Sequence, residues 1–79
     1  MKKWFVYMLR CKGGSLYTGV TTDLDRRVAE HQSGKGAKYT RAHLPVVLVW
    51  SEVTDSESDA KKREAELKKL KKFEKEALI

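Results

Sequence analysis

Three short apolar runs along the chain predict the strands of a small sheet. The first covers residues 4–9, where aromatic and β-branched side chains follow one another, and the second covers residues 16–20. Residues 13–15, Gly-Gly-Ser, lie between them and predict a hairpin turn, so these two strands should be antiparallel. The third run, residues 46–50, is the clearest strand in the sequence and can pair with the first.

Two segments that begin with capping residues predict helices. Thr22 or Asp23 can cap a helix that runs to about Gln32, because Ser and Gly follow there and stop it. Ser56 can cap a second helix, which has acidic residues in its first turn and should run past Leu70.

The remaining segments are short and have no clear period. Residues 34–41 are rich in Gly and Lys and predict a surface loop with at most one helical turn, and residues 73–79 predict a short last helix or a docked tail. The order β-β-α-β-α, with a short final α, predicts an α+β fold. We expect a three-stranded antiparallel sheet flanked by helices, in a single domain over residues 1–79.

The first predicted helix carries polar side chains on its apolar face. Leu24 and Val28 have the spacing of core residues. Arg27 and His31 fall on the same stripe, where a charged group needs a partner or a ligand. The alternative is that both side chains lie at the edge of the stripe and reach water.

The second long helix shows a similar conflict. Ala60, Glu64 and Leu67 share one face, so Glu64 points toward the apolar body, whereas lysines such as Lys68 point away. A lone carboxylate placed there is either a salt-bridge partner for Arg27 or a metal ligand. Periodicity alone favours the salt bridge.

Whether Tyr7 and Tyr17 share a face of the sheet depends on the strand register. A two-residue turn would send the two side chains to opposite faces, whereas a three- or five-residue loop would put them on the same face. A shared site requires the second register. The alternative for each tyrosine is a core aromatic residue with its hydroxyl at the edge.

Charge and cysteine content indicate which partners and which compartment suit the chain. Lys and Arg number 17 against 11 for Asp and Glu, and the net charge of +6 suits either a polyanionic partner or simply a solvated surface. Cys11, the single cysteine, cannot form an internal disulfide and should pack in the core, which suits a reducing compartment. We see no signal peptide or membrane span, so the cytoplasm is the expected location.

Several of these residues together resemble the GIY-YIG nucleases. Phe-Val-Tyr ends at Tyr7 and Tyr-Thr-Gly begins at Tyr17, in the place of the two tripeptides that name the family. The helix that follows is similar to the signature helix of the family, with the invariant arginine at Arg27 and the His or Tyr one turn later at His31. Glu64 resembles the metal-binding glutamate of the later helix. The resemblance covers nearly the whole chain and is greatest to small standalone bacterial members and to the nuclease domain of excision-repair nucleases.

The resemblance implies a metal-dependent hydrolysis of DNA. Glu64 would hold a divalent cation, Mg²⁺ with Mn²⁺ as a substitute, together with waters and phosphate oxygens. Arg27 would clamp the scissile phosphate. Tyr7 would orient or deprotonate the attacking water, with its pKa lowered by Arg27 and the metal. Tyr17 would form a hydrogen bond to the water or the phosphate. His31 would orient these groups or shuttle a proton. Which tyrosine is the general base stays open.

The basic loop after the first helix would bind the nucleic acid. Its candidate contacts are Lys35, Lys38 and Arg41 to the DNA backbone, and Tyr39, which either stacks on a base or packs. The expected activity is structure-directed rather than sequence-directed and serves DNA repair or processing, with a partner protein available for targeting. The alternatives are a non-catalytic DNA-binding or adaptor domain and, less favoured, RNA as the substrate. Many family members carry an Asn after the glutamate, and this chain has none.

Overall fold

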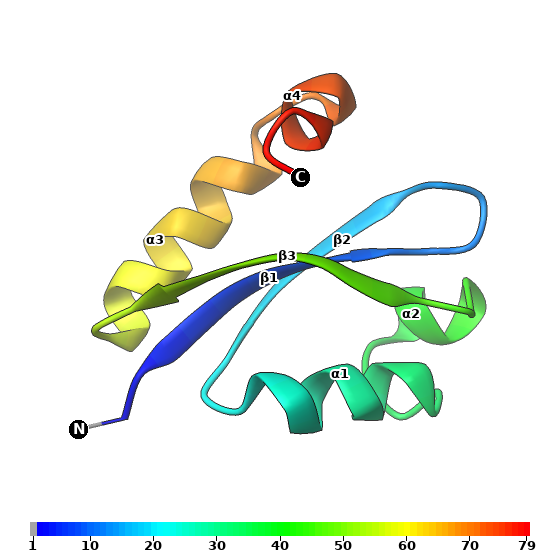
Figure 1. The fold of residues 1–79 in the computed structure, drawn as a ribbon, viewed down its shortest axis with the longest axis horizontal. Helices are drawn as coiled ribbons and strands as arrows, with labels where there is room; N and C mark the ends of the chain where they lie inside the picture. The colour runs from blue at the N-terminus through cyan, green and yellow to red at the C-terminus, as the bar shows by residue number, and fades with distance from the viewer. Residues whose placement is uncertain (1) are drawn as a thin grey trace.

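The computed structural model describes residues 2–79 and has a three-stranded antiparallel sheet at its centre (Figure 1). The strands are β1 (Trp4–Arg10), β2 (Leu16–Thr21) and β3 (Val47–Thr54), in the order β2-β1-β3. The predicted fold class and the pairing of the third strand with the first are confirmed. The predicted end of β3 at residue 50 is wrong, because its more polar second half continues the edge strand to Thr54.

Four helices complete the fold: α1 (Leu24–Gln32), α2 (Lys38–Ala42), α3 (Glu57–Lys68) and α4 (Lys72–Glu76). The side chain of Asp23 caps α1, and that of Ser56 caps α3, as each accepts a hydrogen bond from a backbone N–H three residues later. The prediction that the long helix runs past Leu70 is wrong. Its last turn tightens, since the N–H groups of Lys69 and Leu70 bond to carbonyls only three residues earlier.

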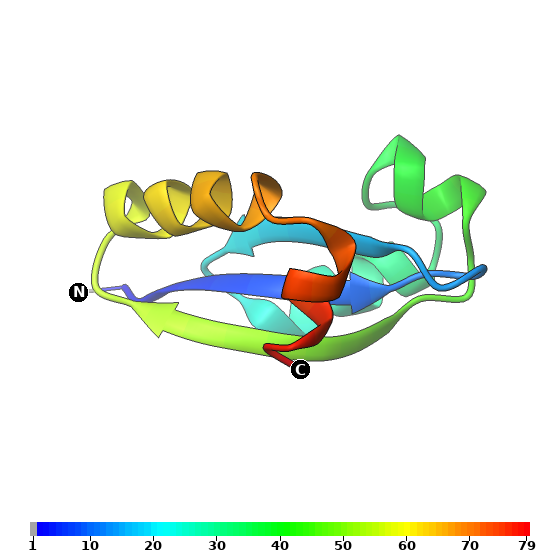
Figure 2. The same cartoon turned by 90° about the horizontal axis from the view of Figure 1, so that it is seen from above.

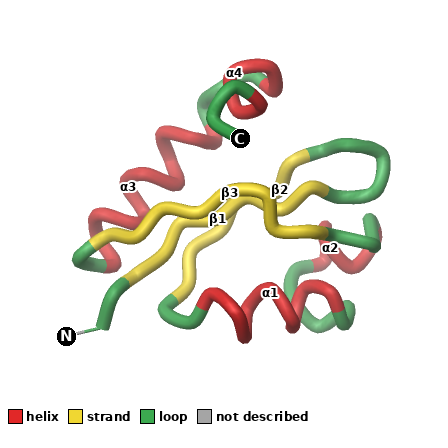
Figure 3. The backbone as a smooth tube through the Cα atoms, viewed as in Figure 1, coloured by secondary structure: helices red, strands yellow, loops and turns green. Residues whose placement is uncertain are grey.

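The helices cover both faces of the sheet, with α1 and α2 on one side and α3 on the other (Figures 1 and 3). Seen from above, α3 lies along the strands (Figure 2). On the α1 face, Tyr7 and Leu9 belong to one core cluster, which also includes Cys11 as a packed thiol. On the α3 face, Val6 packs with Leu67 and other residues in a second cluster. The alternation along β1 therefore divides the core into two halves.

The register of the β1–β2 hairpin puts the two tyrosines of interest on the same face. Tyr7 pairs with Gly19, and Leu9 pairs with Tyr17. Five residues, 11–15, connect the strands, with Gly13 and Gly14 at positive φ in the turn. This is the register that a shared site requires.

An ion pair connects α4, near the C-terminus, to the end of β1. The Arg10 guanidinium at the end of β1 bonds to both carboxylate oxygens of Glu76, one of them at 2.6 Å. This fork-to-fork pair holds α4 beside the hairpin. Within residues 2–79, no helix has the length and apolar character needed to cross a membrane.

Candidate active site

Tyr7 reaches from the central strand across the edge strand β2. Its cross-strand partner is Gly19, and a Cβ atom at that position would lie 2.5 Å from the Tyr7 hydroxyl oxygen. Only a glycine leaves room for the phenol there. Tyr7 is 1% exposed, and its hydroxyl forms a 2.8 Å hydrogen bond with Nε2 of His31. The phenol is thus a buried group at one edge of the sheet, held by a histidine.

His31 lies fully buried at the end of α1, with a polar partner at each ring nitrogen. Besides the bond to Tyr7, its Nδ1 lies 2.8 Å from the hydroxyl oxygen of Thr40 on α2. The Tyr17 ring packs beside it, with the ring centroids 5.2 Å apart. The alternative in which His31 reaches water at the edge of the helical stripe is therefore wrong, because protein groups satisfy both nitrogens instead.

The burial of this cluster shifts the pKa values of its two titratable members. Burial raises the pKa of Tyr7 to about 12, and the charge of Arg27 lowers it only in part. Arg27 alone does not bring this pKa below its ordinary value, because the free-energy cost of burying a phenolate exceeds the stabilisation from one guanidinium, and the contribution expected from a metal stays a prediction. Burial and the charge of Arg27 lower the pKa of His31 below 6.5. At pH 7 Tyr7 is protonated and His31 is neutral.

Arg27 lies at the border between the buried cluster and solvent. Its side chain is 32% exposed, and its guanidinium donates a 3.1 Å hydrogen bond to Glu30 one turn later. The salt bridge to Glu64 that the helical period favoured is wrong, since α1 and α3 cover opposite faces of the sheet and Arg27 pairs within its own helix. A half-exposed ion pair of this kind contributes little to stability, so Arg27 can exchange Glu30 for another anion.

Glu64 approaches the same edge of the sheet from the opposite face. Its carboxylate raises the pKa of Tyr7, so the two groups are close enough to interact. The Glu64 side chain is 21% exposed, and its carboxylate forms an ion pair with the ammonium group of Lys68 at 3.2 Å. Lys68 is exposed, as its position on the helix predicted, and its ammonium group reaches the Glu64 carboxylate from the solvent side. The edge strand β2 is where groups from α1, β1 and α3 meet.

The donor set around Glu64 fits only one kind of metal binding. Among residues 2–79, no three His, Cys, Asp or Glu side chains gather into a metal-binding group. A single partly exposed carboxylate does not hold a cation alone, but Mg²⁺ and Mn²⁺ accept few protein ligands and keep water or phosphate oxygens for the rest. The residues present therefore fit a hard divalent cation that is held largely by water and substrate.

The basic segment after α1 folds partly into α2 and lies beside the tyrosines. Tyr39 is 41% exposed, and its ring stacks on that of Tyr17 with centroids 6.2 Å apart. Its hydroxyl donates a hydrogen bond to Ser15. Lys35, Lys38 and Arg41, the other predicted contacts for nucleic acid, are exposed in the same segment.

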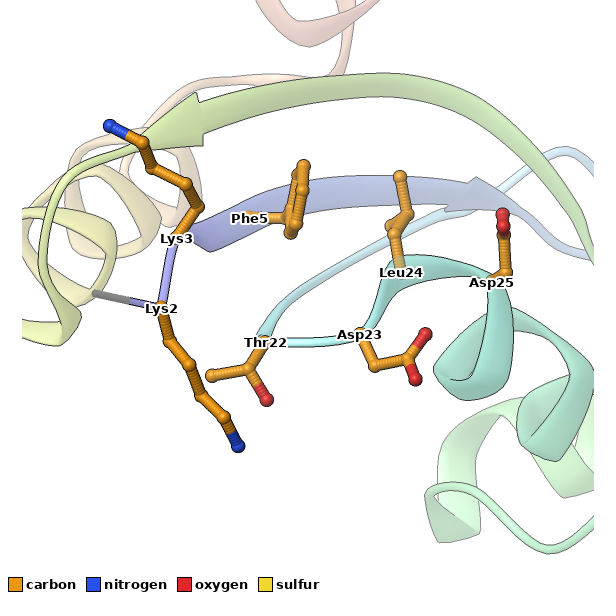
Figure 4. A pocket seen from close by; sticks show the side chains of 7 residues that line it. All are labelled: Lys2, Lys3, Phe5, Thr22, Asp23, Leu24 and Asp25. Carbon is orange, nitrogen blue, oxygen red and sulfur yellow. The ribbon is translucent and has the colours of Figure 1, made fainter.

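Of two hollows on the surface of residues 2–79, one borders the site and the other does not. The first, about 390 Å³, is lined by Tyr17, Tyr39 and two lysines that the sequence analysis did not assign to binding, Lys68 and Lys75, among others. The second, about 520 Å³, lies between the starts of β1 and α1, with Lys2, Lys3, Phe5 and residues 22–25 around it (Figure 4). The second hollow contains none of the predicted site residues, and its charges are mixed.

Sequence reasoning missed two residues that shape the buried cluster. Thr40 bonds to His31, and Gly36 lies so close to the imidazole that a Cβ atom there would come within 3.0 Å of three ring atoms. Both belong to a segment without periodicity, so no pattern singled them out. The Gly-rich composition of this segment was the one available signal, since glycines often mark a close approach.

Comparisons of the sequence and of the structure with known proteins point to the same family. The GIY-YIG catalytic domain matches residues 3–77 of the chain. A UPF0213 protein of Staphylococcus haemolyticus is 48% identical over 79 residues, which is 100% of this chain and 96% of the relative. A UPF0213 protein of Halobacterium salinarum is 53% identical over 74 residues, 94% of this chain and 96% of the relative. The solution NMR structure of a UPF0213 protein from Bacillus halodurans is 50% identical, with a TM-score of 0.62 over 96% of this chain and 81% of that one.

Proposed function

The chain belongs to the GIY-YIG family, and on that premise we propose that it is a divalent-metal-dependent endonuclease that hydrolyses phosphodiester bonds in DNA. The observation that carries the proposal is the hydrogen bond of 2.8 Å between Tyr7 and a buried neutral histidine, within electrostatic reach of Arg27 and Glu64. A domain that only binds DNA has no use for a buried proton acceptor beside these charges. Repair or processing of DNA in the cytoplasm is the setting we propose.

Tyr7 acts in this mechanism as a proton relay. A phenol whose pKa is about 12 does not ionise at neutral pH, but it can pass on one proton while it receives another. As the water oxygen attacks phosphorus, a water proton moves to the Tyr7 oxygen and the Tyr7 proton moves to Nε2 of His31. The bond from phosphorus to the 3′ oxygen breaks, and the 3′ oxygen takes a proton from solvent water to become a hydroxyl. His31 is left as an imidazolium, which later releases its proton to solvent.

Arg27 and Glu64 handle the charge of the phosphate. The planar guanidinium of Arg27 can exchange Glu30 for two phosphate oxygens. A divalent cation bound at Glu64 would stabilise charge on the phosphate and on the leaving 3′ oxygen. Tyr17, which packs against His31, presents its hydroxyl to the water or the phosphate.

The DNA backbone is bound by the basic surface that surrounds β2. The exposed cations of the α2 segment and the lysines of the smaller hollow border both sides of the tyrosines. Such contacts hold phosphates without reading bases, so we propose that the shape of the DNA directs cleavage. The groups proposed for this surface are Lys35, Lys38, Tyr39, Arg41, Lys68 and Lys75.

A nuclease assay tests this function directly. The parent protein is incubated with single-stranded, flapped and branched DNA in the presence of Mg²⁺ or Mn²⁺. We expect cleavage of at least one substrate, and loss on the order of 100-fold or more in rate for both Arg27→Ala and Glu64→Ala. DNA binding is measured beside cleavage.

Two neighbouring residues serve as matched controls. Arg26→Ala and Glu66→Ala remove the same charges from exposed positions on the same helices, where side chains are 61% and 59% exposed. These variants should cleave at nearly the parent rate. A parent that binds DNA and cuts nothing would instead support the adaptor function, and full activity of both test variants would refute the site.

A further inference from the structure

The ability of His31 to take a proton depends on which ring nitrogen already carries one. A neutral imidazole has one N–H donor and one bare acceptor nitrogen, and its hydrogen-bond partners select between the two tautomers. At Nε2 the partner is the Tyr7 hydroxyl, and at Nδ1 it is the Thr40 hydroxyl. Because a hydroxyl can donate or accept, these two bonds alone leave the tautomer open.

The other contacts of Thr40 decide which partner donates in its hydrogen bond with His31. Its hydroxyl oxygen lies 3.0 Å from the carbonyl oxygen of Ala37 and 3.3 Å from the backbone nitrogen of the same residue. Two oxygens at 3.0 Å need a hydrogen between them, and a carbonyl has none to give. The Thr40 hydrogen therefore points to Ala37, and toward His31 its oxygen can only accept.

An acceptor beside Nδ1 requires a hydrogen on that nitrogen. In neutral His31 the other nitrogen, Nε2, is then bare, and Tyr7 must be the donor in the 2.8 Å bond. Water does not compete with this arrangement, because His31 and Thr40 are both 0% exposed. The two hydrogen bonds and the carbonyl contact thus form one directed chain from Tyr7 through His31 to Ala37.

We propose that Thr40 is a positioning residue that holds neutral His31 in the Nδ1–H tautomer, so that Nε2 can take the proton of Tyr7. The proposal rests on the relay described under the proposed function. With the opposite tautomer, Nε2 would carry a hydrogen and could not accept another from Tyr7. Thr40 touches no reacting atom and acts only through the imidazole.

The segment that carries Thr40 is built to keep the ring in place. The side chain of Ala37 cannot cap α2, and Thr40 bonds to the Ala37 backbone in its stead, so one hydroxyl organises the start of α2 and the imidazole together. Gly36 closes the other side, since any Cβ there would collide with the ring. His31 is therefore confined in both its plane and its tautomer.

Nitrogen NMR of the parent protein tests the tautomer without any measurement of activity. The ¹⁵N chemical shifts of the imidazole distinguish a protonated from a bare nitrogen. At pH 7 we expect a protonated Nδ1 and a bare Nε2 in His31. The reverse assignment, or shifts averaged between the two nitrogens, would overturn the proposal, whether or not the protein cleaves DNA.

Two substitutions at Thr40 then connect the tautomer to the reaction. Thr40→Val removes the hydroxyl at nearly constant volume, and Thr40→Ser keeps it. We expect the valine variant to show averaged or reversed ¹⁵N shifts and a cleavage rate about 10- to 100-fold lower at unchanged DNA affinity, the range typical for loss of an orienting partner. The serine variant should keep the tautomer and the parent's rate.

The outcomes separate this proposal from the function on which it rests. A valine variant with the parent's tautomer contradicts the proposal, whatever its rate, because the hydroxyl then does not set the ring. If the valine variant does not fold, the parent spectrum and the serine variant still decide. A parent with the expected tautomer that cuts no DNA would refute the proposed function and leave the role of Thr40 on the ring intact.

Discussion

The half of the candidate site around His31 is closed and hydrogen-bonded throughout, whereas the half around Glu64 is open to water. Tyr7, His31 and Thr40 are each no more than 1% exposed, and each bonds to the next at 2.8 Å. The Glu64 side chain is 21% exposed, and its only ion-pair partner among residues 2–79, Lys68, is 57% exposed. The half around His31 is a series of buried side chains linked by hydrogen bonds, and the half around Glu64 is a solvent-exposed ion pair.

This difference matches the two tasks that we assign to the halves. A proton relay works only when donor and acceptor are held within hydrogen-bond distance and in the right tautomer, which requires packing on every side. A hard cation that keeps much of its water needs one accessible carboxylate and tolerates movement. Substitutions should therefore affect stability and chemistry in the closed half, and mainly metal binding in the open half.

The largest effect is expected from Gly36→Ala. A Cβ atom at this position would lie within 3.0 Å of three atoms of the buried His31 ring, so either the ring or the backbone must move. Overpacking of this kind costs about 1–3 kcal/mol of unfolding free energy, measured by urea denaturation. A displaced ring should also lower cleavage by roughly 100-fold.

Lys68→Ala provides the matching change in the open half. It removes a solvated ion pair without creating a clash, so we expect the free energy of unfolding to change by less than about 0.5 kcal/mol. Equal destabilisation by the two substitutions would contradict the division into a closed and an open half.

The next effect concerns the pH dependence of stability. Charged or titratable groups around His31 are Tyr7, Tyr17, Arg27 and Glu30, and of these Arg27 adds to the effect of burial while Glu30 opposes it. The pKa of His31 lies below 6.5 in the folded protein, so the unfolded chain takes up its proton first as the pH falls. The contribution of His31 to the free energy of unfolding should therefore be constant above pH 7 and fall as the pH decreases below 6.5.

His31→Gln isolates this contribution. The variant is expected to be less stable at every pH but to lose the part of the slope between pH 6.5 and the lowered pKa. Cleavage by the parent should decline at lower pH, around and below the lowered pKa of folded His31, because imidazolium cannot accept the Tyr7 proton. A slope below pH 6.5 that persists unchanged in His31→Gln would show that another group causes it.

The smallest effect is expected from Lys68→Met. The ammonium group of Lys68 competes with a cation for the Glu64 carboxylate at 3.2 Å, and a pair this exposed is worth at most about 1 kcal/mol. Its removal should tighten Mn²⁺ binding by about 2- to 5-fold, measured by calorimetry. Lys61→Met is the control, since Lys61 forms the equivalent pair with Glu57 at 3.3 Å on the same helix. Weaker Mn²⁺ binding in Lys68→Met would contradict this account.

The helical and strand periods predicted the framework of the site well. The spacing of Arg27 and His31 on a stripe with leucine and valine indicated two polar groups near the core, and the structure has a fully buried His31 there. The sequence allowed the register that puts Tyr7 and Tyr17 on one face, but it could not distinguish this register from the alternative. The register depends on the length of the hairpin loop, which two adjacent glycines allow in more than one form.

The partners of the polar groups were beyond the reach of sequence patterns. Arg27 and Glu64 each have the right period to face inward, but the sheet separates their helices and each finds a partner within its own helix. The bond between His31 and Thr40 joins two helices across an irregular segment, where no period applies. The pKa of Tyr7 is a balance between burial and charge, and only the fold reveals how deep the phenol lies.

Single-turnover cleavage by Tyr7→Phe, with Tyr17→Phe beside it, tests the central claim most directly. The substitution removes only the hydroxyl through which the water proton would pass to His31. We expect the rate to fall by about 100-fold or more while Mn²⁺ and DNA affinities stay at the parent values, and the rate of Tyr17→Phe to fall less. Cleavage by Tyr7→Phe at the parent rate would show that the buried tyrosine and its histidine take no part in the reaction.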